Sequence, residues 1–343
     1  MAYISFQPSD YFSTLLWEGT GASNAITGVG FQPDIVWIKD RDSTAQGQIA
    51  DSPSGATKYW VPSENYSQST NAESIKSFDS DGYTLGTQGN VNASGNSLVG
   101  WNWKGGTTSG IDTTGADITP TSYSFSQTAG ISVIRYTGNG TTGAKIAHGL
   151  GSVPQFIFVQ NTQTFENRLV YHAALGNTKY LIFNTTAAEA TAARWNDATP
   201  TSVYFEVDNN DAANKSGETI MAYCFAPIKG FSSFGSYVGN ANADGTFIYT
   251  GFRPAFVLLK KYNSTNNWVM LDDKRQGFNP NTSELYGNSD SAECDTSCYR
   301  VDLLSNGFKM RNSSPTINDG SYVYAAFAEF PLVSSNSKAG TAR

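Results

Sequence analysis

The two histidines are the first residues to consider for chemistry, because imidazole is the side chain best suited to exchange protons near neutral pH. His148 lies in AHGLG, directly before a turn, and His172 lies in LVYHAAL. Neither is accompanied by a Gly-x-Ser-x-Gly nucleophile elbow, by metal-ligand spacing or by an aspartate at a recognisable distance. We therefore interpret His148 as a turn residue and His172 as a strand residue that faces a neighbour's carbonyl.

Pairs of carboxylates could support glycoside hydrolysis, which uses two acidic groups beside the scissile bond. The visible pairs are Asp79 with Asp81 and Asp272 with Asp273. They stand beside Gly or Lys in sequence typical of turns, where Asp bonds to the backbone, and adjacent strand residues point to opposite faces. The chain has no phosphate-binding Gly-x-x-x-x-Gly-Lys and no dinucleotide fingerprint. We expect no catalytic residues and no cofactor.

A metal site is considered at two places. The loop VDNNDAANKSGE (207–218) offers oxygen ligands suited to calcium, but its spacing differs from an EF-hand and polar hairpin loops have the same composition. Those ligands would be Asp208, Asn209, Asn210 and Asp211. Cys294 and Cys298 offer only two thiols, whereas zinc normally takes four ligands, so we interpret them as free or disulfide-linked loop residues. Cys224, in IMAYCFA, is predicted to be a buried thiol. We predict no metal site.

Exposed aromatic rings beside amides and carboxylates could bind sugars, because a sugar needs apolar ring contact and directional hydrogen bonds. The candidate glycan contacts are Trp60, Trp195, Asn196, Asp197 and Trp268. The alternative is that these rings pack between sheets or modules, as large aromatic side chains usually do. Tyr59, beside the first tryptophan, has a counterpart in Tyr180, which favours packing.

Composition limits the classes of protein. The 343 residues are 39% hydrophobic and only 15% charged, with 33 Gly, 18 Tyr and 20 Phe, which favours short strands and polar turns. The net charge of −7 is spread without a basic run, so nucleic acid is not an expected partner. No apolar stretch approaches the roughly 20 residues of a membrane span, and the N-terminus lacks signal-peptide features. We expect an all-β protein made in the cytosol.

The chain repeats three times, and the repeat predicts its organisation. The aligned segments are GFQPDIVWIK from Gly30, GSVPQFIFVQ from Gly151 and GFRPAFVLLK from Gly251. Each has a turn, a proline, an apolar run and a polar last residue. The apolar run is typical of a strand buried on both faces or of the central strand of a sandwich. Other features lie at similar distances from the proline in each copy. They are the upstream phrases WEGTG, YTGNG and YVGNA and the downstream aromatic residues Tyr83, Phe205 and Phe308.

These units predict three tandem β-sandwich modules of the jelly-roll or lectin-like kind, with short loops and little helix. The proposed boundaries are an N-terminal arm (1–13), repeat 1 (14–104), a Gly/Thr-rich linker or crossing segment (105–130), repeat 2 (131–230), repeat 3 (231–333) and a loose tail (334–343). Repeats 2 and 3 are joined almost directly and should pack on each other. The only helix-like stretch is TTAAEATAARW (185–195).

Whole phrases of the chain resemble a family of tailed-phage virion proteins. They include YTGNGTTGAKIAHGLGSVP, YHAALGNTKYLIFNTT, SGETIMAYCFAPIKGFSSFGSYVGN and GFRPAFVLLKKYNSTNNWVM. The family is common in marine phages, and its members are usually described as tail fibre or structural proteins. The resemblance spans about residues 15–333, but its phrases are structural and carry over no functional residue. The third copy departs most, at QGFNPNTSELYGNSDSAECDTSCY.

The resemblance implies a bacteriophage virion protein, either a host-adhesion tail fibre or a capsid decoration protein. The expected partners are other virion proteins and a host surface glycan, with no nucleic acid and no membrane. Since phage fibres are typically homotrimers, we also expect a homo-oligomer. Residues 1–13 could serve as a virion anchor. A polysaccharide-degrading tail spike and a free carbohydrate-binding module are the alternatives.

Overall fold

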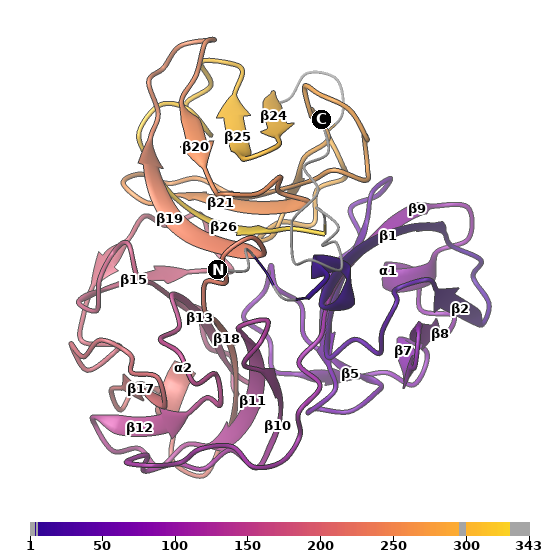
Figure 1. Ribbon diagram of the computed structural model, residues 1–343. Coiled ribbons are helices and arrows are strands. Elements are labelled where there is room, and N and C mark those ends of the chain that lie inside the picture. Colours follow the sequence, from indigo (N-terminus) through magenta and orange to yellow (C-terminus); the bar gives the residue numbers. More distant parts are fainter. Residues whose placement is uncertain (1–3, 5, 295–299, 330–343) are drawn as a thin grey trace.

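The computed structural model describes residues 4, 6–294 and 300–329, and almost all regular structure in them is antiparallel β-sheet. The all-β prediction is confirmed. Helix is limited in this part of the chain to three single turns: η1 (Pro8–Asp10), α1 (Gly89–Asn92) and α2 (Asp211–Asn214). The strands form three lobes around a common centre, with lobe 1 in purple, lobe 2 in pink and magenta, and lobe 3 in orange and yellow (Figure 1).

Each lobe contains a main sheet and a small sheet with the same strand order. In lobe 1 the main sheet is β1 (Phe12–Glu18), β9 (Ser97–Trp103), β3 (Ile35–Asp40) and β4 (Gln48–Asp51), and the small sheet is β2 (Asn24–Thr27), β8 (Gly82–Leu85) and β7 (Ile75–Asp79). A separate pair is β5 (Lys58–Tyr59) and β6 (Ser69–Thr70).

In the main sheet, the last strand of the repeat lies between the first strand and the central strand, and this order recurs in the other two lobes. Lobe 2 has one extra strand outside the first strand of its repeat, and its small sheet has two strands. Lobe 2 has β10 (Ser122–Ser126), β11 (Ile131–Thr137), β18 (Thr219–Phe225), β13 (Phe156–Asn161), β14 (Leu169–His172), β15 (Lys179–Ile182) and β16 (Ala190–Thr191), with β12 (Ala144–Ala147) and β17 (Tyr204–Val207) as its small sheet. Lobe 3 has β19 (Ser232–Val238), β26 (Ser321–Phe327), β21 (Phe256–Lys261), β22 (Trp268–Asp272) and β23 (Leu285–Tyr286), with β20 (Phe247–Tyr249), β25 (Gly307–Met310) and β24 (Val301–Leu304).

The apolar run after each repeat proline forms the central strand of a main sheet, and its side chains divide between two cores. In β3, Val36 and Ile38 face the small sheet of lobe 1, while Ile35 and Trp37 face the centre of the molecule. The same alternation occurs in β13 and β21. Because strand side chains alternate between faces, an uninterrupted apolar run is what two buried faces require.

The glycine of the upstream phrases is fixed by a close approach of two backbone segments. A Cβ atom on Gly138 would lie 2.4 Å from the carbonyl oxygen of Lys215, so no larger residue fits. The buried Asn214 then ties the two segments together, because its side chain accepts from Asn139 N–H (2.9 Å) and donates to the Thr141 carbonyl (2.8 Å). The equivalent asparagines, Asn92 and Asn318, are also fully buried.

Three expectations need correction. The stretch 185–195 is not helical: it contains the short strand β16, and its backbone bonds to lobe 3 through Glu189 N–H and the Thr186 carbonyl. These contacts outweigh a helical propensity that comes mostly from alanine. Strand β1 begins at Phe12, inside the predicted arm, and β10 lies inside the predicted linker.

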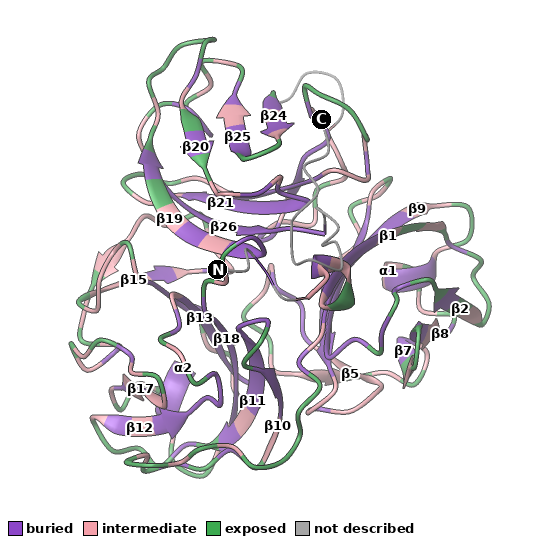
Figure 2. Cartoon of the chain, viewed as in Figure 1, coloured by how far each residue is buried: buried purple, intermediate pink, exposed green. Residues whose placement is uncertain are grey.

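The lobes are also not independent modules, because they share one core at the centre (Figure 2). Ile4 is buried in that core and Phe6 packs against it, so these arm residues contact the protein itself. The anchor role of residues 1–13 stays a prediction. The predicted tail (334–343) lies outside the described residues.

Replacing Asn214 with alanine should lower the free energy of unfolding by about 1–3 kcal/mol, because the Thr141 carbonyl and Asn139 N–H lose their partner. Chemical denaturation measures the change. Asn209→Ala, at an exposed position of the same loop, is the matched control and should change stability by less than about 0.5 kcal/mol. Equal effects of the two substitutions would contradict the assigned role.

Candidate functional site

The junction of the three lobes gathers the largest set of buried aromatic side chains in the described residues. Phe183 of lobe 2 contacts Trp37 of lobe 1 (5.6 Å between ring centroids) and Trp268 of lobe 3 (4.9 Å). Trp60 of lobe 1 stacks on Phe158 of lobe 2 at 4.9 Å. Such ring pairs contribute about 0.5–1.5 kcal/mol each beyond the burial of their area.

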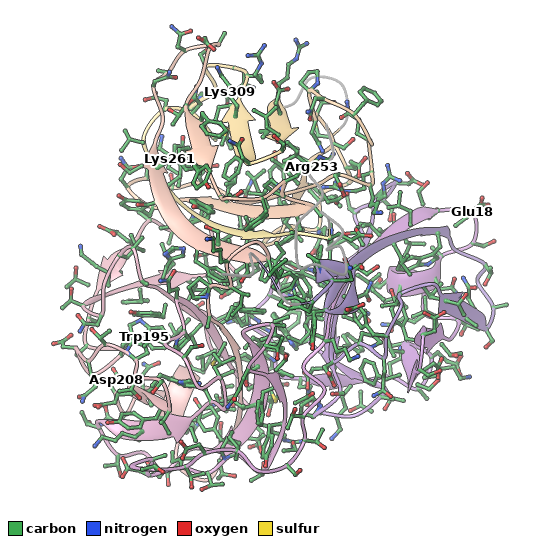
Figure 3. The ribbon with its side chains drawn as sticks, viewed as in Figure 1. Glu18, Trp195, Asp208, Arg253, Lys261 and Lys309 are labelled. Carbon is green, nitrogen blue, oxygen red and sulfur yellow. The ribbon has the colours of Figure 1, made fainter. Side chains whose placement is uncertain are left out.

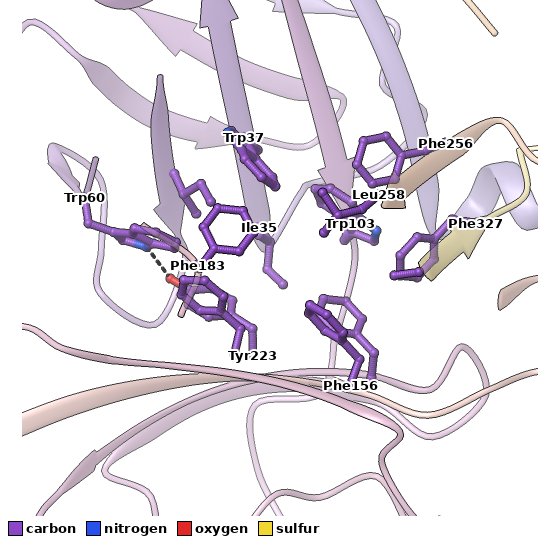
Figure 4. A pocket seen from close by; sticks show the side chains of 14 residues that line it. Ile35, Trp37, Trp60, Trp103, Phe156, Phe183, Tyr223, Phe256, Leu258 and Phe327 are labelled. Atoms are coloured by element: carbon purple, nitrogen blue, oxygen red, sulfur yellow. Dashed lines mark hydrogen bonds between the residues drawn. The ribbon is translucent and has the colours of Figure 1, made fainter. Parts of the chain in front are cut away.

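The rings surround an apolar cavity of about 60 Å³ (Figure 4). Ala325 of β26 lies on its wall, at the position that Trp101 occupies in β9 and Tyr223 in β18. The smaller side chain in lobe 3 therefore accounts for part of the space. A cavity with apolar walls stays dry and offers no polar group for chemistry.

The three tryptophans predicted as sugar platforms are buried, each with 1% of its surface exposed. The indole N–H of Trp60 donates to the Tyr223 hydroxyl (2.7 Å), that of Trp268 to the Ile182 carbonyl (3.2 Å), and that of Trp195 to the Lys179 carbonyl (3.2 Å). The prediction of sugar stacking at these rings is wrong, and their packing role is confirmed. The cause is the shared core: two of the three rings are covered by a neighbouring lobe, which no local pattern reveals.

Trp195 has a different location from the other two, inside the core of lobe 2 (Figure 3). Beside it, Asn196 and Asp197 have positive φ angles of 51° and 50° and form a turn. The Asn196 amide donates to Glu206 (2.6 Å), and the Asp197 carbonyl accepts from Asn177 (2.7 Å). Asp197 alone of the predicted glycan contacts is exposed.

A ring of hydrogen bonds joins the three lobes. It passes through the last residues of β4, β14 and β22, the strands that follow the central strands along the chain. Asp51 accepts from the Tyr223 hydroxyl of lobe 2 (2.8 Å), His172 donates to the Tyr324 carbonyl of lobe 3 (3.1 Å), and Asp272 accepts from the Trp101 indole of lobe 1 (3.1 Å). Lobe 1 thus binds lobe 2, lobe 2 binds lobe 3, and lobe 3 binds lobe 1.

Each of these three side chains also closes the turn after its own strand. Asp51 accepts from Ser54 N–H (2.8 Å), His172 from Ala174 N–H (3.2 Å) and Asp272 from Arg275 N–H (2.9 Å). One side chain therefore fixes both a local turn and a contact between lobes. Burial raises the pKa of Asp51.

Both histidines are neutral structural residues. His148 accepts Leu150 N–H on Nδ1 (3.1 Å), so its Nε2–H donates to the Thr201 carbonyl (3.1 Å). Burial lowers the pKa of His148 and of His172 to about 4, although each carbonyl partner opposes the shift. The predicted carbonyl partner of His172 is confirmed. His148 lies directly after β12, and its turn role stays a prediction.

A charged cluster strengthens the contact between lobes 1 and 3. The side chain of Arg275 is completely buried and binds Asp272 (2.6 Å) and Glu293 (2.9 Å). Arg41 of lobe 1 binds the same Glu293 with two parallel bonds of 2.9 Å. The neighbouring Asp273 pairs instead with Arg253 (2.7 Å). Since each predicted carboxylate has an arginine partner, this pair supports packing.

A second ring consists of buried cations, each bound to a backbone carbonyl of another lobe. Lys39 of lobe 1 donates to Ser289 O in lobe 3 (2.6 Å), and Lys260 of lobe 3 donates to Thr186 O in lobe 2 (3.0 Å). These lysines are the polar last residues of the repeated apolar runs, at the same position in β3 and β21. Desolvation by burial lowers the pKa of Lys39 to about 8 and that of Lys260 to about 7.

Lobe 2 completes this ring with a different residue. Its central strand, β13, has Gln160 at the position of the lysines. The cation of lobe 2 is Arg168, which directly precedes β14, the strand paired with β13. Arg168 donates to Tyr66 O in lobe 1 (2.9 Å), and its guanidinium lies 5.3 Å from the Trp60 ring. Burial lowers the pKa of Arg168 to about 9.

The other predicted polar sites serve turns. Asp79 accepts from the Thr84 hydroxyl (2.8 Å), and Asp81 accepts from the N–H groups of Gly28 and Gly30. In the loop 207–218, three of the four predicted calcium ligands contact other groups of the protein (Asp208 is labelled in Figure 3), and Asn209 is exposed. Asp208 pairs with Arg194 (2.8 Å), Asn210 caps α2, and Asp211 lies 3.6 Å from Lys215.

Within residues 4, 6–294 and 300–329, His, Cys, Asp and Glu form no group that could hold a metal. Cys224 is a buried free thiol, as predicted, and burial raises its pKa. Cys298 lies outside the described residues, so its pairing with Cys294 stays a prediction. No helix in the described residues has the length and hydrophobicity needed to cross a membrane.

The residues that hold the junction were mostly missed from sequence, although the alignment contained a signal. Asp51, His172 and Asp272 lie at one position of the repeat, and Lys39 and Lys260 lie at another. Polar residues at the ends of apolar strands suggest turns, and no local pattern indicates that their side chains reach the neighbouring lobe. The arrangement as a whole can hold three sheets in one orientation.

The chain matches the family described as "Domain of unknown function (DUF7483)" over residues 7–331, almost its entire length, and therefore belongs to it. No curated protein and no solved structure matches the chain.

Asp272→Asn should lower the free energy of unfolding by about 3 kcal/mol, because it removes the charge that balances the buried Arg275. Chemical denaturation of the purified protein measures the change. Asp319→Asn, at an exposed position of the same lobe, is the control. An Asp272→Asn protein as stable as the control would show that the ion pair with Arg275 does not stabilise the fold.

The stability of the chain should rise between pH 7 and about pH 9. Lys39 and Lys260 titrate at about 8 and 7 when folded but near 10.5 when unfolded, so the unfolded chain binds more protons across this interval. Raising the pH therefore favours the folded chain. Lys260→Met should flatten the rise in unfolding free energy measured at pH 7, 8 and 9.

The control for this titration is Lys76→Met, which removes an exposed lysine and should leave the slope unchanged. A wild-type stability that falls from pH 7 to pH 9, or equal flattening by both substitutions, would contradict the role of the buried lysines.

Proposed function

We propose that the chain is a structural protein of a tailed-phage particle and acts there as a tail-fibre or host-adhesion component. The observation that carries the proposal is the double ring of contacts at the junction, in which the buried polar side chains join one lobe to the next. Residues placed in this way stabilise a scaffold. The proposal rests equally on the repeated phrases that resemble phage virion proteins.

The closed arrangement suits a particle component physically. Each lobe contacts both others, so no lobe can separate without exposing its share of the aromatic core. Because all three lobes belong to one chain, dilution does not weaken their association. Apolar burial also depends less on ionic strength than exposed ion pairs do.

Adhesion is favoured over the alternative of a polysaccharide-degrading tail spike. Hydrolysis of a glycosidic bond needs two carboxyl groups that flank the substrate. Asp272 and Asp273 are instead bound to Arg275 and Arg253, and Asp79 and Asp81 close a turn. A capsid decoration protein stays the second candidate, since the same scaffold would serve it.

A homotrimer is part of the proposal. Strand β20 is an edge strand of lobe 3, and its Phe247 and Tyr249 are 42% and 66% exposed. Edges of this kind are commonly covered by self-association. Mass photometry at micromolar concentration should show three chains together, and a monomer alone would remove this part of the proposal.

The chain should be found in purified phage particles, at the tail, by cryo-electron microscopy and by antibody labelling. The purified protein should also compete with intact particles for adsorption to host cells, because an adhesion protein occupies their receptor. Labelling on the capsid would favour decoration. New reducing ends from host polysaccharide, or absence of the protein from particles, would contradict the proposal.

A further inference from the structure

A polar groove of about 530 Å³ lies where lobe 1 meets the segment that leads into lobe 2. Its walls include Tyr11 and Lys104 of lobe 1, residues 105–107 and 109–110, and residues at and after the end of β10. Hydroxyl groups of Thr107, Ser109 and Thr128 belong to residues of this lining, together with the ring of Phe125. Phe125 is only 5% exposed, so the groove combines a cation, hydroxyl groups and the half-buried ring of Tyr11.

Lys104 is a departure from the repeat. It follows the last strand of lobe 1, and its backbone N–H donates to Tyr11 O, one residue before β1. The same backbone bond is made by Ala226 to Gly130 O and by Ala328 to Phe231 O, and both alanines are fully buried. The fold thus needs only a small side chain here, and the lysine of lobe 1 is additional.

The connecting segment is a second departure. It runs from the end of β9 at Trp103 to the start of β11 at Ile131, whereas lobes 2 and 3 are joined by the short stretch between Phe225 and Ser232. The longer connection supplies most of the groove wall. Long connections inside compact folds commonly carry function.

Lys104 is the one charged residue in the lining of the groove, in a chain whose net charge is −7. The lining contains no Asp or Glu, and no described carboxylate lies within ion-pair distance of Lys104. Its Nζ lies 5.9 Å from the ring centroids of both Tyr11 and Phe31, which positions the ammonium group without neutralising it. Asp34 is not part of the lining, and its carboxylate accepts from the N–H groups of two lining residues, Gly105 and Gly106 (2.8 and 2.9 Å).

We propose that this groove binds an acidic saccharide, with the carboxylate of the sugar on Lys104. The volume exceeds that of a simple inorganic anion, and hydroxyl groups beside the Tyr11 ring suit a polyhydroxylated ring. One unpaired cation matches one negative charge per bound unit. This inference deepens the proposed adhesion role and rests on it for its biological meaning, while the binding itself can be measured on the isolated chain.

The test uses cellobiouronic acid, a disaccharide with one carboxylate, and its neutral counterpart cellobiose. Titration calorimetry and ligand-observed NMR should show that the chain binds the acid. Its affinity for cellobiose should be about tenfold lower, because cellobiose cannot make the charged hydrogen bond. Lys104→Met keeps the stem over the two rings and removes the charge, so it should weaken binding of the acid by about tenfold and leave cellobiose unchanged. Raised salt should weaken binding of the acid only.

Lys145→Met is the matched control, because Lys145 also lies over an aromatic ring, that of Tyr204 at 5.4 Å, but outside the groove. It should bind the acid as the wild type does. Thermal unfolding verifies that both variants fold. The inference is overturned if the folded wild type binds no acid at millimolar concentration or binds both sugars equally. It is also overturned if Lys104→Met leaves the affinity for the acid unchanged.

Adsorption competition separates this inference from the proposed function. If Lys104→Met competes with particles as well as the wild type does, the groove is not the receptor site and the adhesion role stands. If the wild type binds the acid but neither competes for host cells nor occurs in particles, the adhesion role fails and the groove stands as a saccharide site.

Discussion

Mutual burial of aromatic rings at the centre determines how the rest of this chain is built. Each main sheet has two apolar faces, one covered by its own small sheet and the other by the two neighbouring lobes. A single lobe would expose the second face, including rings such as Phe158 and Trp268, at a cost of roughly 1.5–3 kcal/mol for each large apolar side chain left in water. The lobes are therefore stable as a set.

Burial of apolar area has no preferred direction, so it cannot by itself fix how the lobes are turned against one another. The directional contacts are the two rings of polar side chains. One passes through Asp51, His172 and Asp272 and the other through Lys39, Lys260 and Arg168. A buried polar group without its partner is costly, so any other orientation of the lobes is disfavoured.

Differences between the copies show where the repeat was free to change. His172 reaches a backbone carbonyl because Ala325 replaces the large side chain found at that position in the other lobes. In lobe 2 the buried cation moved from the central strand to the facing segment. Lys104 and the long connection after it belong to neither ring of contacts. Instead they line the polar groove, and the residues equivalent to Lys104 in the other two lobes are buried alanines.

The sequence alone determined the class of fold, the three copies and the strand buried on both faces, because these depend on local spacing: a turn, a proline and an apolar run. It also indicated that His172 would meet a carbonyl and that the aspartate pairs belong to turns. The repeat does not indicate what covers the second apolar face of each sheet. Only the tertiary structure shows that the other lobes cover it. For that reason Trp60 and Trp268, which had the composition of a sugar platform, are core residues. A pattern along the chain specifies which face is apolar, but the partner for that face lies roughly a hundred residues away and becomes defined only when three sheets meet.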